Sequence, residues 1–232
     1  MTAADHHPVA AVIPYWLGRP ALEALEVAHA AGSVGIGAVW AGEMLSFDAF
    51  ALMGALARET SLHLTVGPLA VGIRTPVGIA MGVASLQALA GTERVAVALG
   101  ASTRAVTEGW HGREWTDLPA RLEETAGIVR GVLDGERTDH AGALSTRGFR
   151  LGIESASPEV AIAAFGPRSL EVAGEVADRL VVNLVTPVQA GRLAEAVPGR
   201  PVTAWVGTAV DPTPEALARI RRQVVLYLAA PG

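Results

Sequence analysis

The sequence has no cysteine, and its 18 basic residues are all arginine, so lysine is absent as well. Without cysteine the chain cannot form disulfides, thiolate nucleophiles or thiolate-bound metal sites. Without lysine it cannot carry a Schiff-base nitrogen or the lysine of a phosphate-binding P-loop. These two absences exclude Schiff-base aldolases, P-loop hydrolases and cysteine-dependent enzymes.

A strong charge of one sign and a long hydrophobic run are also missing. The formal net charge is −5, so the chain presents no excess of basic charge for nucleic acid or anionic lipid. The longest weakly polar stretch, 77–91, is interrupted by Ser85 and Gln87 and is too short to span a bilayer. Residues 1–8 lack the apolar core of a signal peptide. We therefore expect a cytoplasmic protein with neither nucleic-acid nor membrane partners.

The chain has ample apolar material, since half of its 232 residues are hydrophobic and 18% are charged. That composition suits one sizeable core. Short apolar segments alternate with longer amphipathic ones. The expected strands are 9–14, 38–40, 62–66, 94–99, 160–164, 180–183 and 202–206. The expected helices are 20–31, 48–59, 76–90, 118–133, 166–176, 188–197 and 214–228, with Asp48 and Thr75 as candidate N-caps.

Strand and helix alternate seven times, which predicts a parallel sheet with helices on the outside. The polar, glycine-rich segment 134–151 is expected to be an excursion from this pattern. Seven units are one short of the closed (β/α)8 TIM barrel. The chain stops after its seventh helix, where an eighth strand would follow. We therefore predict a single α/β domain over residues 1–232, a TIM-type barrel that lacks its eighth unit at the C-terminus.

Six segments then match a known family in order and spacing. They are GIGAVWAGE (35–43), LHLTVGP (62–68), GTERVAVALG (91–100), AAFGPRSL (163–170), AGEVAD (173–178) and NLVTP (183–187). With these segments the chain resembles the luciferase-like monooxygenase superfamily, and within it the oxidoreductases that use the deazaflavin coenzyme F420. The resemblance implies a barrel with the tricyclic ring of the cofactor in its mouth, and hydride transfer to or from a small organic substrate.

The resemblance places cofactor contacts at the third strand and after the fourth. Val66, Gly67 and Pro68 correspond to a strained or cis peptide that bulges against the ring in this family. Glycine permits close approach, and a bond before proline adopts the cis form at low cost. A plain Gly-Pro turn is the alternative. Gly100, Ala101 and Ser102 follow the fourth strand; a serine hydroxyl can hydrogen-bond a ring edge but is a poor proton donor.

A second set of cofactor contacts lies where the helix 166–176 begins. In the family this turn contacts the phosphate of the cofactor, which implies that role for Phe165, Gly166 and Pro167, with Arg168 as an ion partner. Amides at a helix start carry the positive end of the helix dipole and can hold a phosphate. An ordinary strand-to-helix turn, with proline at the first helical position, is the alternative.

Glu43 is the catalytic candidate. It ends the second strand, where the family commonly has Asp-His, whereas this chain has Glu43-Met44. A carboxylate under the ring could orient it or shuttle a proton. The missing imidazole removes any mechanism that uses it as an acid or base. A solvated loop glutamate is the alternative.

Two residues are candidates for substrate contact. Trp110 lies in the loop after the fourth strand, where an aromatic side chain can wall a pocket or only pin the loop. Thr186 could contact an anionic substrate or the cofactor tail, or could cap the helix that follows Pro187. The histidines are scattered without metal-ligand spacing, so we expect no metal site.

Four functional hypotheses remain. The first is an F420-dependent oxidoreductase acting on a small organic substrate. The second is an FMN-dependent luciferase-like monooxygenase, and the third is a shortened relative that binds flavin without turnover. Another parallel-barrel enzyme, such as a metal-dependent hydrolase, is the fourth. The resemblance also implies a homodimer formed through the apolar segments 49–57 and 79–89.

Overall fold

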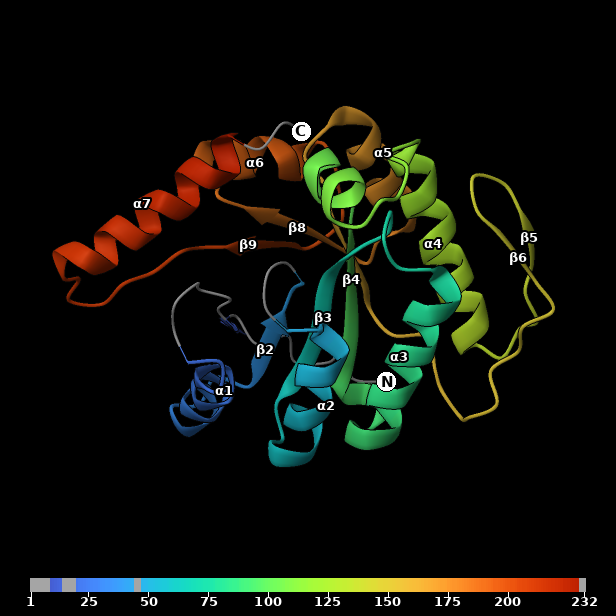
Figure 1. The fold of residues 1–232 in the computed structure, drawn as a ribbon, viewed down its shortest axis with the longest axis horizontal. Helices are drawn as coiled ribbons and strands as arrows, with labels where there is room; N and C mark the ends of the chain where they lie inside the picture. The colour runs from blue at the N-terminus through green and yellow to red at the C-terminus, as the bar shows by residue number, and fades with distance from the viewer. Residues whose placement is uncertain (1–8, 14–19, 44–46, 230–232) are drawn as a thin grey trace.

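The computed structural model describes residues 9–13, 20–43 and 47–229 (Figure 1). Seven parallel strands form one sheet in the order β1-β2-β3-β4-β7-β8-β9. The strands are β1 (Ala11–Val12), β2 (Ala38–Ala41), β3 (His63–Ala70), β4 (Val95–Gly100), β7 (Val160–Ala163), β8 (Arg179–Asn183) and β9 (Val202–Trp205). This is the predicted architecture, a nearly closed parallel barrel one strand short of the TIM type.

The helices cover the outer face of the sheet (Figure 1). They are α1 (Glu23–Ser33), α2 (Ala49–Glu59), α3 (Pro76–Ala90), α4 (Leu118–Leu133), α5 (Pro167–Val176), α6 (Pro187–Glu195) and α7 (Pro214–Ala229). The short helices η1 (Thr92–Arg94) and η2 (Ala105–Trp110) flank β4. All seven predicted strands and helices are present in order, with shifts of a few residues at their ends.

Two helices begin where their capping residues predict. The side chain of Asp48 accepts a hydrogen bond from the amide of Ala51 at 3.0 Å, and that of Thr75 accepts from the amide of Gly78 at 3.2 Å. Each satisfies one amide that the helix itself leaves unpaired. Both predicted N-caps are therefore confirmed.

β3 is longer than the sequence predicted. It runs to Ala70, so Gly67 and Pro68 lie inside the strand rather than at its end. The pairing of β3 with β4 shifts register between Val66 and Leu69, which is a β-bulge. A bulge accommodates proline within a strand because the missing N–H falls where the ladder is already interrupted.

Two apolar layers hold the barrel together. The larger lies between the strands and the helices and includes Leu64, Val97 and Ile162. The smaller lies inside the barrel, where Trp40 packs with the small residues Ala98 and Ala161. Alternate residues of each strand face the two layers, so nearly every strand residue is buried, as the continuous apolar strands indicated.

The excursion at 134–151 forms an antiparallel hairpin of β5 (Asp139–Ala141) and β6 (Ser145–Arg147) outside α4 (Figure 1). The carboxylate of Glu124, on α4, accepts hydrogen bonds from the amides of Ala143 and Leu144 at 2.9 and 2.7 Å. His140 Nε2 lies 3.0 Å from the same carboxylate. One glutamate therefore fastens the tip of the hairpin to the barrel.

Candidate functional site

The carboxyl ends of the strands converge on a group of small residues. Gly42 follows β2, and the place that a Cβ of Gly42 would occupy lies 3.7 Å from both the carbonyl oxygen of Gly67 and Cδ of Pro68. At the end of β4, the Cβ position of Gly100 lies 3.3 Å from Cβ of Pro68 and 3.5 Å from Cβ of Ala163. Small residues therefore line the ends of β2, β3 and β4, and the indole of Trp205 reaches the same place, with Cη2 3.4 Å from the Cβ position of Gly42.

Gly67 occupies a position that only glycine fits. Its φ is +119°, and an added Cβ would lie 2.2 Å from the carbonyl oxygen of Ala98 on β4. The peptide bond between Gly67 and Pro68 is cis, which is one of the two geometries that the resemblance implied. Val66 is fully buried and faces the outer layer. Contact of Val66, Gly67 and Pro68 with a cofactor remains a prediction.

Glu43 lies in a network of charges. Arg74, in the turn after β3, donates from Nε to Glu43 Oε2 at 2.8 Å, and its Nη2 contacts both Glu43 Oε1 and Asp48 Oδ2. The amide of Ala49 donates to Glu43 Oε1 at 3.2 Å. The guanidinium group also stands over the ring of Phe50, 5.1 Å from its centroid. Both oxygens of Glu43 are therefore engaged; Met44 lies outside the described residues.

The pKa values reflect this network. The hydrogen bond from Arg74 to Glu43 raises the pKa of Arg74 above its ordinary value, against the opposing effect of burial. Burial alone would raise the pKa of Asp48, but hydrogen bonds from the amide of Ala51 and from Arg74 outweigh it, so the pKa of Asp48 is lowered. The charged forms of Arg74 and Asp48 are therefore favoured.

The start of α5 is exposed and has no side-chain cap. Gly166 stands at the N-cap position without a side-chain hydrogen bond, and Pro167 begins the helix. Phe165 is 46% exposed, and the side chain of Arg168 is 74% exposed with Asp117 3.6 Å away. The amides at this helix start are therefore accessible, which the predicted phosphate contact requires.

The other predicted residues lie around the same end of the barrel. Ala101 and Ser102 follow β4, and Ser102 is exposed with a φ of +67°. Trp110 is 54% exposed and ends η2, a turn of π-helix where the sequence predicted a loop. Thr186 is the N-cap of α6: its hydroxyl accepts from the amide of Gln189 at 3.2 Å. This confirms its capping role, while a role in substrate binding remains a prediction.

Three residues of this region were missed from the sequence. Arg74 lies four residues beyond the end of β3, in the turn before α3. Trp40 and Trp205 lie on strands 165 positions apart in the chain, yet their rings meet edge to face, with centroids 5.9 Å apart and planes at 85°. Local sequence carries no signal for that contact.

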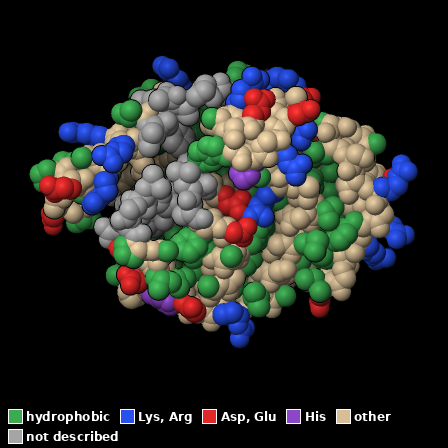
Figure 2. Space-filling view, in the orientation of Figure 1, with side chains coloured by type: hydrophobic (Ala, Val, Ile, Leu, Met, Phe, Trp, Pro, Cys, Tyr) green, Lys and Arg blue, Asp and Glu red, His purple; other side chains and the backbone are tan. Residues whose placement is uncertain are grey.

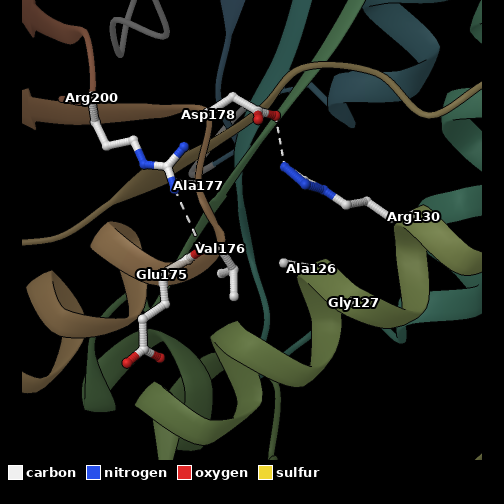
Figure 3. A pocket seen from close by; sticks show the side chains of 8 residues that line it. All are labelled: Ala126, Gly127, Arg130, Glu175, Val176, Ala177, Asp178 and Arg200. Carbon is white, nitrogen blue, oxygen red and sulfur yellow. Dashed lines mark hydrogen bonds and ion pairs between the residues drawn. The ribbon is translucent and has the colours of Figure 1, made fainter.

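Two hollows in the surface lie at the opposite end of the barrel. One of about 260 Å³ lies between α4 and the segment that joins α5 to β8 (Figure 3). Arg130 contacts Asp178 there at 2.6 Å, and Arg200 donates to the carbonyl oxygen of Gly174 at 3.1 Å. Because these arginines bind the protein's own oxygen atoms at the amino ends of the strands, they hold the fold together. A second hollow lies between the C-terminal ends of α1 and α2.

Within the described residues, no group of three or more His, Asp or Glu side chains is placed to hold a metal ion. In the same part of the chain, no helix is both long enough and apolar enough to cross a membrane.

Comparisons with known proteins agree with this fold. Over 202 residues the chain is 28% identical to a Mycobacterium tuberculosis protein provisionally named a coenzyme F420-dependent oxidoreductase, which covers 78% of this chain and 56% of that protein. It is 26% identical over 171 residues to the 5,10-methylenetetrahydromethanopterin reductase of Methanolobus tindarius, covering 72% and 52%. The chain thus spans about half the length of these relatives.

Among solved structures, an F420-dependent secondary alcohol dehydrogenase bound to an F420-acetone adduct superposes with a TM-score of 0.70. The identity is 21%, and the match covers 82% of this chain and 64% of that one. The family model for luciferase-like monooxygenases matches residues 4–227. The chain belongs to the luciferase-like monooxygenase family.

Proposed function

We propose that this chain binds coenzyme F420 at the carboxyl ends of its parallel strands and acts as an oxidoreductase on a small organic substrate. The proposal rests on where the family-like segments lie in the fold. Five of the six segments reach this one end of the barrel, and only the segment at 173–178 lies elsewhere. Ligands of parallel barrels bind at this end because the loops that follow the strands meet there.

The residues present fit a planar cofactor with a phosphorylated tail. Gly42, Gly67 and Gly100 bring backbone rather than side chains to the strand ends, which suits a flat ring. The start of α5 offers exposed amides without a side-chain cap. Inside the barrel, Trp205 Nε1 is a buried donor with no acceptor in the described part of the chain. When bound, F420 supplies the hydride chemistry, and the protein binds and orients it.

The charge network assigns Glu43 a positioning role. Both of its oxygens accept hydrogen bonds, from Arg74 and from the amide of Ala49. A carboxylate whose two oxygens are both held by donors is fixed in place, so it orients what lies beside it. In this proposal Phe165, Gly166, Pro167 and Arg168 bind the phosphate, while Trp110 and Thr186 lie on the substrate side.

Titration of the purified chain with F420 and with FMN, followed by absorbance spectra, tests the proposal. We expect saturable F420 binding and oxidation or reduction of the coenzyme with an organic substrate. FMN binding with oxygen-dependent turnover would support the monooxygenase alternative, which the family assignment favours. Binding without turnover would indicate a non-catalytic relative. Binding of neither cofactor would refute all three.

A homodimer through α2 and α3 is part of the same proposal. Met81 and Leu89 on α3 are 49% and 42% exposed. Hydrophobic side chains gather in the lower half of the visible face, over these helices (Figure 2). A molar-mass measurement in solution tests it; a monomer at micromolar concentration would contradict it.

A further inference from the structure

The side chains that face the interior of the barrel differ in size from one side to the other. Along β4 and β7 the residues that face inward are small: Ala98, Ala161 and Ala163. The space they leave is filled from the other side by two indoles, Trp40 on β2 and Trp205 on β9. Large residues opposite small ones keep a barrel interior at protein density.

Trp205 lies at the end of the barrel where the cofactor is proposed to bind. Its Cη2 atom stands 3.4 Å from the place that a Cβ of Gly42 would occupy, and Gly67 and Pro68 lie 3.7 Å from the same point. The indole is therefore next to the bulge of β3. A Cβ at position 42 would be in van der Waals contact with this ring.

The indole N–H finds no acceptor among the described residues. Trp205 Nε1 is buried and makes no hydrogen bond within the described part of the chain. A buried donor without an acceptor is unfavourable, and buried tryptophan N–H groups usually have a partner. A bound molecule with an acceptor atom in this part of the barrel would supply the missing partner. Flavin and deazaflavin rings carry carbonyl oxygens on a flat ring, and a flat ring suits glycine-lined strand ends.

We propose that Trp205 forms part of the cofactor site, with its indole against the planar heteroaromatic ring and its Nε1–H donating to a carbonyl oxygen of that ring. The inference rests on the proposed function and adds a residue to the same site. The indole of Trp205 also meets the ring of Trp40 edge to face. Nothing in the inference depends on whether the ring belongs to F420 or to FMN.

The test compares Trp205→Phe with Trp40→Phe. Both variants replace an indole by a smaller ring in the same interior cluster, but only the first removes the buried donor at the strand ends. Titrations with F420 and with FMN would measure the dissociation constant and the absorption maximum of the bound ring. Loss of one hydrogen bond and part of a ring contact predicts binding weaker by roughly tenfold in Trp205→Phe. We also expect a shift of the absorption maximum in this variant only.

Thermal melting of both variants without cofactor controls for folding. If Trp205→Phe does not fold, 3-benzothienylalanine at position 205 keeps the shape of the indole and replaces N–H by sulfur. Equal affinity and an unchanged spectrum in the position-205 variant would overturn this inference while leaving the proposed function intact. If the wild-type chain binds neither cofactor, the inference falls together with the proposed function.

Discussion

Gly67 is the residue at which the barrel leaves least room for a side chain. Replacing Gly67 with Ala would force a Cβ to within 2.2 Å of a β4 carbonyl oxygen at a φ of +119°. We expect the free energy of unfolding to fall by about 2–4 kcal/mol, because strands β3 and β4 must separate or the bulge must rearrange. Chemical denaturation would measure the loss.

Gly127→Ala is the matched control for that substitution. Gly127 lies inside α4, and an added Cβ there meets nothing within 4 Å. Alanine in a helix is favoured over glycine by about 1 kcal/mol, so this variant should be equal to or more stable than the wild type. Equal stability of the two variants would show that the bulge is not constrained as described.

Arg74 is the second residue with an effect that can be measured. Arg74→Gln leaves Glu43 and Asp48 without their cation, so we expect the pKa of Asp48 to rise toward its ordinary value, 3.8. Because the folded pKa lies below 3.8, the interaction stabilises the fold above that pH and is lost as the pH falls through the folded value. Titration of the Asp48 carboxyl by nuclear magnetic resonance would follow the shift.

Arg147→Gln is the control for Arg74→Gln. Arg147 pairs with Asp139 at 3.3 Å, but both side chains are more than four-fifths exposed. An exposed pair contributes about 0–1 kcal/mol, so this variant should melt like the wild type. An unchanged Asp48 pKa in Arg74→Gln would contradict the network.

Among the elements, the β5–β6 hairpin is joined to α4 through the carboxylate of Glu124. Glu124→Gln weakens the two hydrogen bonds that hold the hairpin tip, because a neutral amide oxygen is a poorer acceptor than a carboxylate. We expect the amides of Ala143 and Leu144 to exchange hydrogen with solvent several-fold faster. The exposed Glu154, changed to Gln, should leave the exchange unchanged.

Low pH should weaken the attachment of the same hairpin to Glu124. Burial alone would raise the pKa of Glu124, but the amides of Ala143 and Leu144, with His140, lower it below 4.5. The attachment of the hairpin tip to Glu124 is therefore complete above pH 4.5. It is lost as the pH falls through the lower pKa that Glu124 has in the folded chain. If the protection factors of these two amides change neither in Glu124→Gln nor with pH, other contacts hold the hairpin in place.

Elements with local signals could be predicted, and long-range contacts could not. Asp48 and Thr75 mark helix starts because capping involves only three or four neighbouring residues. The β3 bulge arises from pairing with β4, and the Arg74–Glu43 pair joins residues 31 positions apart. The family resemblance indicated Glu43 as a site residue, but it did not indicate that Arg74 pairs with Glu43. The π-helix that ends at Trp110 also had no recognisable signal.

At the scale of the whole molecule, the parallel barrel brings five of the six family-like segments to one end. Among the described residues, β1 and β9 are the two edges of the sheet and do not pair with each other. The edge-to-face contact of Trp40 and Trp205 nevertheless joins β2 to β9 across the interior. In the described part of the chain, seven strands therefore surround an interior whose sheet remains open between β1 and β9.

The central claim is that a planar redox cofactor lies at the carboxyl ends of the strands. A crystal structure of the chain grown with F420 tests it most directly. We predict density for the ring beside Gly67, Pro68 and Trp205, with the phosphate at the start of α5. Density in the hollow beside Arg130 and Arg200 instead, or a strand-end site that stays empty at saturating coenzyme, would contradict the claim.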